Sequence, residues 1–229
     1  MSIIGTFNGW QIVSLPCDTI ARVTHPSSIE FDEQEVVATN QMAFTGQEQV
    51  YDWMASWWEA QVSFPPMNRW SYDAWSAFIS ECRGPLNVFL IGDPKAKKPK
   101  GSVPVPVSVP APGRLHGLLN VPMVSGAGQT GYSLSTRGWT PNAENILLFG
   151  DFIQVGLRLY KVTDVVNADG SGDATLPVWP PVRDLPADGS AIITRGCRGL
   201  FRLKAASGNK HSVNVGLYGL SGFPIREAI

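Results

Sequence analysis

The sequence predicts a mainly β protein, and two observations lead to this prediction. Glycine and proline are abundant, with 23 and 18 occurrences in 229 residues, and both residue types punctuate short strands and turns. Short apolar stretches with alternating or β-branched residues recur along the chain, whereas only one stretch has clear helical spacing. We therefore expect two β-rich domains and a single helix.

The N-terminal 64 residues are typical of strands. A short stretch, residues 11–15, ends at Pro16, and a longer one, residues 35–45, ends at Gly46. Residues 50–64 are rich in aromatic side chains, and Trp58, Ala60, Val62 and Phe64 alternate so that they would share one face of a strand. We expect this third strand to run to Pro65.

The one predicted helix covers about residues 71–83. Ser71 is its expected N-cap, and Asp73 lies in the first turn, where a negative charge is favourable. Apolar residues at i, i+3, i+4 and i+7 would form one buried face; they are Trp75, Phe78, Ile79 and Cys82. Gly84 and Pro85 should end the helix, and residues 87–91 form the next strand.

A change in composition marks a domain boundary after this strand. Residues 95–100 contain four lysines, and residues 101–113 alternate valine with proline, which cannot build a central strand. We interpret 101–113 as a linker. Residues 1–100 and 197–229 would then form one domain, with residues 114–196 inserted as a second.

The inserted segment predicts a small barrel or sandwich. Strands are expected at 152–155, 159–166, 174–179 and 191–194, with Pro180-Pro181 ending the third. Residues 199–204 and 211–218 alternate again and should complete the first domain.

The charges are unevenly distributed. The chain has a net charge of −1, which gives no argument for a nucleic-acid or membrane partner. Residues 1–94 nevertheless hold 11 acidic and 3 basic residues, and residues 197–229 hold 5 basic residues and 1 acidic residue. The acidic and basic blocks can attract each other within a chain or between subunits.

Two glycine-containing motifs imitate cofactor or metal sites. Residues 126–131 match G-x-G-x-x-G, but a strand pattern follows where a dinucleotide site needs a helix. Residues 167–172 resemble the first half of a calcium-binding loop, but Val178 occupies the position of the required glutamate. We expect both to be turns between strands, and we expect no cofactor.

The sequence contains no catalytic or metal-binding residues with the spacing of a known motif. The histidines, His25, His116 and His211, are isolated from one another and from cysteine pairs, so zinc spacing is missing. No G-x-S-x-G motif frames a nucleophile. The acidic cluster Glu30, Asp32, Glu33 and Glu35 is interpreted as a solvated loop. We expect a protein that is not an enzyme, although a hydrolase remains an alternative.

The cysteines and the first residues indicate the compartment. The chain has an odd number of cysteines, namely Cys17, Cys82 and Cys197. This number suits buried thiols in a reducing cytoplasm. The first ten residues lack the pattern of a signal peptide, and no apolar stretch has the length of a membrane span. We expect assembly in the cytoplasm without membrane insertion.

The eight tryptophans are candidates for an interface, where this residue type is enriched. Trp53, Trp57, Trp58 and Trp70 are either interface or core residues. Trp139 and Trp179 lie near glycine and proline turns and are candidates for stacking on a sugar ring.

Four segments together resemble proteins of phage tail-tip gene clusters. They are Trp75-Ser-Ala-Phe78 with residues 83–84 and 88–94; residues 150–156 with 159–162; residues 168–176 with 179–183; and residues 199–203. In size and layout the chain is most similar to the distal tail proteins of long-tailed bacteriophages.

The resemblance implies a ring-forming β-sandwich domain that carries a helix, and an inserted β-barrel of OB-like or galectin-like type. It implies a structural virion protein whose hexameric ring joins the tail tube to the tip or baseplate. The implied partners are copies of the chain itself, the tail tube protein, and hub and fibre proteins, with DNA passing transiently through the channel. The alternative is a carbohydrate- or receptor-binding module of a fibre or baseplate.

Overall fold

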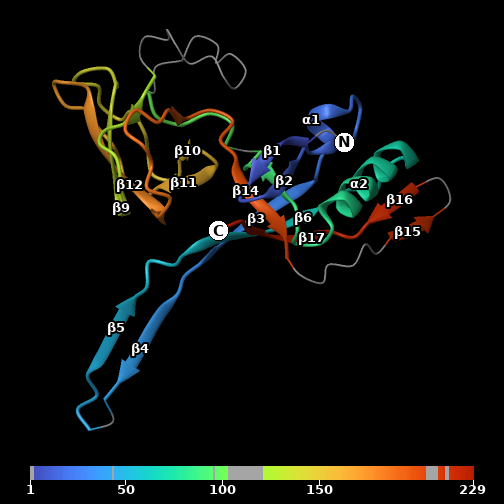
Figure 1. The fold of residues 1–229 in the computed structure, drawn as a ribbon, viewed down its shortest axis with the longest axis horizontal. Helices are drawn as coiled ribbons and strands as arrows, with labels where there is room; N and C mark the ends of the chain where they lie inside the picture. Colours follow the sequence, from blue (N-terminus) through green and yellow to red (C-terminus); the bar gives the residue numbers. More distant parts are fainter. Residues whose placement is uncertain (1–2, 43, 95, 103–120, 205–210, 215–216) are drawn as a thin grey trace. The chain divides into compact units, whose positions relative to one another are not determined.

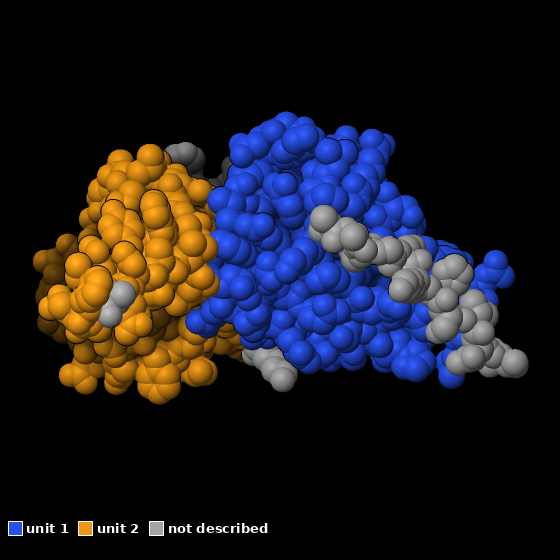
Figure 2. Space-filling model, turned by 90° about the horizontal axis from the view of Figure 1, so that it is seen from below, with its two compact units in different colours: residues 1–34, 57–93, 198–229 blue, residues 35–56, 94–197 orange. Residues whose placement is uncertain are grey.

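The structure is a computed structural model that describes residues 3–42, 44–94, 96–102, 121–204, 211–214 and 217–229. The chain is mainly β, as the sequence predicts. It divides into two compact units, shown in ribbon form in Figure 1 and in different colours in Figure 2. Unit 1 comprises residues 1–34, 57–93 and 198–229, and unit 2 comprises residues 35–56 and 94–197.

Unit 1 is built on a seven-stranded sheet drawn from all three of its segments. In spatial order the strands are β1 (Ile3–Phe7), β2 (Trp10–Val13), β7 (Val88–Ile91), β14 (Gly199–Leu203), β17 (Phe223–Glu227), β6 (Trp57–Ser63) and β3 (Ser28–Gln34). The pair β2–β7 is parallel and the other neighbouring pairs are antiparallel. The expected return of residues 199–204 to the first domain is confirmed, because β14 lies between β7 and β17.

Helix α2 (Arg69–Cys82) packs on this sheet through the apolar face that its sequence predicts. Trp75, Phe78, Ile79 and Cys82 are all buried, and the Phe78 ring lies edge-on to Phe89 of β7 with 5.2 Å between centroids. Burial of such large side chains supplies most of the stability of a helix in a folded protein.

The beginning of α2 differs from the prediction. The N-cap is Asn68, whose side-chain oxygen accepts a hydrogen bond from the Ser71 backbone N–H at 2.8 Å. Ser71 is therefore inside the helix, where its hydroxyl oxygen accepts from the Thr24 backbone N–H at 3.0 Å. Both residue types are good caps, and the sequence alone did not separate them.

Two smaller elements complete unit 1. Helix α1 (Pro16–Thr19) follows β2. The hairpin of β15 (His211–Asn214) and β16 (Leu217–Leu220) contacts α2, where the Tyr72 and Tyr218 rings stack with 5.3 Å between centroids.

Unit 2 contains a six-stranded, nearly closed barrel. Its strands, in spatial order, are β13 (Ile192–Ile193), β10 (Phe152–Val155), β11 (Arg158–Val162), β12 (Asp173–Val182), β9 (Gly131–Arg137) and β8 (Met123–Val124). A bridge between Met123 and Ala191 brings the two ends of this sheet together. Fully buried aliphatic residues, including Leu134, Ile153 and Leu176, fill the interior.

Two predicted strand boundaries are wrong. β12 continues through Pro180 and Pro181 to Val182, because the ladder to β9 is interrupted between Pro177 and Val182 and needs no donor there. The expected strand at 50–64 is divided into β5 (Glu48–Asp52) and β6, with Met54 at a φ of 50° between them.

The domain boundaries lie elsewhere than the sequence suggests. Residues 35–56 group with unit 2, as do residues 94–100, although both were expected in the first domain. Most of the expected linker, residues 103–113, lies outside the described residues. Unit 1 takes the form of one large sheet covered by α2.

Candidate interaction surface

The hairpin of β4 (Val37–Gln41) and β5 is the most unusual surface of the chain. Its register runs from Val37 opposite Asp52 to Gln41 opposite Glu48, and a turn at Gly46, with a φ of 67°, closes it. Every residue of both strands is exposed. We call residues 36–54 the arm (Figure 1).

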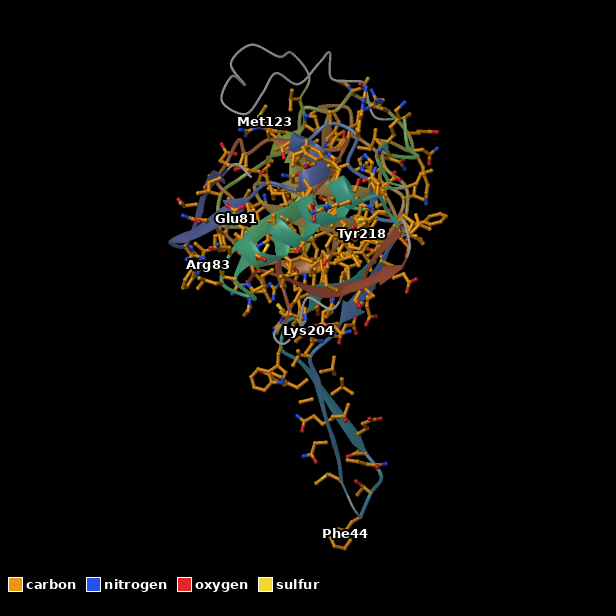
Figure 3. All side chains as sticks on the ribbon, turned by 90° about the vertical axis from the view of Figure 1, so that its right-hand side faces the viewer. Phe44, Glu81, Arg83, Met123, Lys204 and Tyr218 are labelled. Atoms are coloured by element: carbon orange, nitrogen blue, oxygen red, sulfur yellow. The ribbon has the colours of Figure 1, made fainter. Side chains whose placement is uncertain are left out.

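The arm carries large apolar side chains on an exposed element. Their exposed fractions lie between 44% and 101%, and the residues are Val37, Met42, Phe44, Val50, Tyr51, Trp53 and Met54. Figure 3 shows Phe44 at the distal end of the hairpin. An isolated two-stranded hairpin is marginally stable in water, and contiguous exposed apolar surface marks an interaction site. The arm is therefore suited to burial against a partner.

The arm keeps its shape near its base through specific contacts. The Tyr51 and Trp53 rings meet at 5.1 Å between centroids. Asp52 accepts hydrogen bonds from the Met54 backbone N–H and from the Tyr132 hydroxyl of β9, both at 2.8 Å. Partial burial and the bond to the Asp52 carboxylate raise the pKa of Tyr132. The arm base is thus preorganised, which lowers the entropic cost of binding.

The charge of the arm has a single sign. Residues 35–56 include Glu35, Glu48 and Asp52 and no lysine or arginine. An acidic, aromatic surface favours a partner that offers both cationic and apolar groups.

The tryptophans grouped in the sequence occupy different environments. Trp53, on the arm, and Trp70, on α2, are exposed at 60% and 63%, so both are available for an interface. Trp58 is buried in the core of unit 1, where its ring lies edge-on to Phe31 at 5.7 Å. Trp57 is half-buried, and the Arg226 guanidinium lies over its ring at 4.3 Å.

The two tryptophans expected to contact a sugar are buried. Trp139 is 3% exposed and Trp179 is 6% exposed. The Trp139 indole N–H donates to the Thr136 hydroxyl at 2.7 Å, which fixes the ring inside unit 2. Stacking on a sugar needs an exposed ring face, so this assignment is corrected: both are core residues.

The motifs that imitate catalytic or binding sites are turns and strands. Residues 126–131 connect β8 to β9, and the Asp188 carboxylate accepts the Gly126 backbone N–H at 2.8 Å. Asp169 accepts backbone N–H groups of Ser171 and Asp173, which orders the loop before β12. Among the described residues no group of three or more acidic, histidine or cysteine side chains is placed to hold a metal.

The acidic cluster near the arm forms part of a strand. Glu30, Asp32 and Glu33 belong to β3, where Glu30 and Asp32 share one face and Glu33 lies on the other, because side chains alternate along a strand. Glu35 follows β3. The expected loop is thus a strand, but all four acidic residues are exposed, as the interpretation of a solvated cluster requires.

The cysteines are free, and burial governs their chemistry. Burial raises the pKa of Cys17 to about 11 and those of Cys82 and Cys197 to about 12. These thiols stay protonated at neutral pH, which makes them poor nucleophiles.

The sequence predicts strands on both sides of Gly46 but does not predict an exposed arm. β-branched and aromatic residues usually indicate burial, and the arm contains Val37, Val50, Tyr51 and Trp53. One pattern in the sequence does point to exposure: residues 35–56 combine these apolar side chains with three acidic residues and contain no lysine or arginine.

Comparisons with known proteins add no assignment. No protein-family model matches the chain, and no curated protein matches it at a significant level. Neither helix within the described ranges has the length and apolar character needed to cross a bilayer.

Proposed function

We propose that this chain is a structural protein of a bacteriophage tail tip. Its copies assemble head to tail into a hexameric ring that joins the tail tube to the hub and fibres of the tip. The ring leaves a channel through which DNA passes. The chain performs no chemistry in this role and needs no cofactor.

The arm is the observation that carries the proposal. A monomer that exposes Tyr51, Trp53 and Phe44 on one hairpin gains stability when a second molecule covers them. A projecting element that binds a different surface on a neighbour makes a heterologous contact, and heterologous contacts close into rings when the rotation allows it.

The mainly β architecture with an inserted barrel also fits this role. The resemblance of residues 70–204 to tail-tip proteins implies such a layout. The barrel and the arm both belong to unit 2, and the outer face of the barrel provides a second surface for hub or fibre proteins.

The test is the oligomeric state of the purified chain. Native mass spectrometry and negative-stain microscopy at increasing protein concentration should show a closed ring with six-fold symmetry. A variant in which residues 37–52 are replaced by a short glycine-containing turn serves as the control and should remain monomeric and folded. A wild-type chain that stays monomeric at high concentration overturns the proposal.

A further inference from the structure

A second surface, on unit 1, has the character that the arm requires of a partner. A groove with a volume of ≈ 450 Å³ is lined by Trp10, Arg83, Pro85, Leu86 and Arg202. This volume lies in the range of sites that hold a small ligand or a few side chains. Its apolar walls are already partly exposed, with Trp10 at 41% and Leu86 at 37%.

The groove is built where three elements meet. Trp10 begins β2, and Arg202 lies in β14. Arg83 follows α2 in the left-handed conformation, with a φ of 50°, and leads into the turn that carries Pro85 and Leu86 (Figure 3). β2 and β14 flank β7 in the seven-stranded sheet, so one sheet holds Trp10 and Arg202 in place.

The cations of the groove are not neutralised by its own lining. None of the described lining residues is acidic. The Nε atom of Arg202 is buried and has no hydrogen-bond partner among the described residues. A buried donor without an acceptor is destabilising.

The groove and the arm are complementary in both polarity and charge. The groove offers an indole face, apolar walls and two guanidinium groups, which stack on aromatic rings and pair with carboxylates. The arm offers Tyr51 on one face of β5 and Glu48 and Asp52 on the other, because side chains alternate along a strand. Trp53 follows β5, and Phe44 lies at the turn.

We propose that the arm of one copy of this chain docks in the Trp10–Arg83–Leu86–Arg202 groove of a second copy. This inference rests on the proposed function and deepens it, because it names the surface that receives the arm. Each copy donates one arm and offers one groove, so the contact propagates from copy to copy and a ring forms when it closes.

Mixing two defective variants tests this contact directly. One variant combines Arg83→Glu with Arg202→Glu and keeps its arm; the other lacks residues 37–52 and keeps its groove. Each variant alone should be monomeric. Their mixture should form a one-to-one heterodimer and nothing larger, because only one arm and one groove remain intact.

A photo-crosslinker gives a second readout that does not depend on ring closure. Benzoylphenylalanine replaces Phe44 in unlabelled protein, which is mixed with ¹⁵N-labelled wild type. Peptide mass spectrometry should find the crosslink on peptides containing Trp10 or Leu86 that carry the label. Lys98→Glu, an exposed charge reversal in unit 2 outside the groove lining, serves as the matched charge control and should leave assembly unchanged.

The outcomes separate this inference from the proposed function. If the wild type forms rings but the groove variant also does, and no heterodimer appears, the inference is wrong and the proposed function stands. If the arm crosslinks to the groove but the wild type stops at open oligomers, the contact is right and the ring is wrong. A monomeric wild type with no crosslink overturns both.

Trp10→Ala should weaken association by at least about tenfold, as expected of a central aromatic contact.

Discussion

Two hairpins of this chain have the same topology and opposite environments. β10–β11 pairs Phe152–Val155 with Arg158–Val162 across a turn at Gly156, and its aliphatic residues Ile153 and Leu159 are almost fully buried. β4–β5 has strands of similar length, and all of its residues are exposed. The difference lies in what covers each hairpin.

The comparison shows that composition does not decide the role of a hairpin. Both hairpins contain valine and aromatic side chains, but β10–β11 has neighbouring strands on both sides, β13 and β12, whereas the described residues place no further strand beside β4 or β5. An apolar hairpin without such neighbours is stabilised by a partner or not at all. Four sets of variants compare side chains that the fold buries with side chains that it leaves exposed.

The largest expected effect concerns the buried hairpin. Ile153→Ala should lower the free energy of unfolding by about 2–5 kcal/mol, because the fully buried side chain leaves a cavity. Val50→Ala on the arm is the matched control and should change it by about 0.5 kcal/mol or less. Urea denaturation of the monomer measures both. Equal losses would show that the arm packs against the same chain.

Asp151 should give the next largest effect. It is 2% exposed, and its carboxylate accepts backbone N–H groups of Lys100, Gly101 and Leu148. Asp151→Asn replaces one acceptor with a donor, which should cost about 1–3 kcal/mol. Circular dichroism melting detects the loss. An exposed acid, as in Glu144→Gln, is the control and should be neutral; an Asp151→Asn variant as stable as wild type would contradict the bonding described.

On the arm, association and stability should separate. The double variant Tyr51→Ser with Trp53→Ser should leave the monomer's unfolding free energy within about 0.5 kcal/mol, because both rings are exposed. The same variant should lose higher oligomers in analytical ultracentrifugation. The exposed change Trp70→Ser, on α2, controls for general loss of surface aromatics. If the double variant still assembles, the arm is not part of the interface.

The smallest effect is a dependence on pH. Hydrogen bonds from the Gly126 backbone N–H and from Arg137 hold the pKa of Asp188 below its ordinary value. The stabilisation is complete above the unfolded pKa and is lost as pH falls below about 4, through the folded value. Comparing wild type with Asp188→Asn in urea at pH 6 and pH 3 should show a larger difference at pH 6 than at pH 3. A difference of equal size at both pH values would argue against this assignment.

The sequence predicts those parts of the fold that depend on local periodicity. The face of α2 formed by Trp75, Phe78, Ile79 and Cys82 follows from 3.6-residue spacing. The division into β10 and β11 agrees with the strands predicted at 152–155 and 159–166. The strand order does not follow, because β14 enters between β7 and β17 from more than 100 residues away in the chain. Non-local pairing leaves no short-range signal.

The candidate site was predictable only in part. Trp53 and Trp70 were named as interface candidates, but Trp58 has the same residue type and is 1% exposed. Whether a tryptophan is buried or exposed depends on which strands lie beside it in the fold. Similarly, the groove residues Trp10, Leu86 and Arg202 are distant in sequence, and no pattern along the chain connects them.

The point at which the barrel leaves unit 1 has an evolutionary consequence. β7 and β14 are adjacent antiparallel strands, with Ile91 paired to Gly199, so the inserted segment begins and ends at neighbouring positions. Cα atoms of such a pair lie only about 5 Å apart. A short turn can bridge that distance, and different barrels can be exchanged at the same place without altering the sheet.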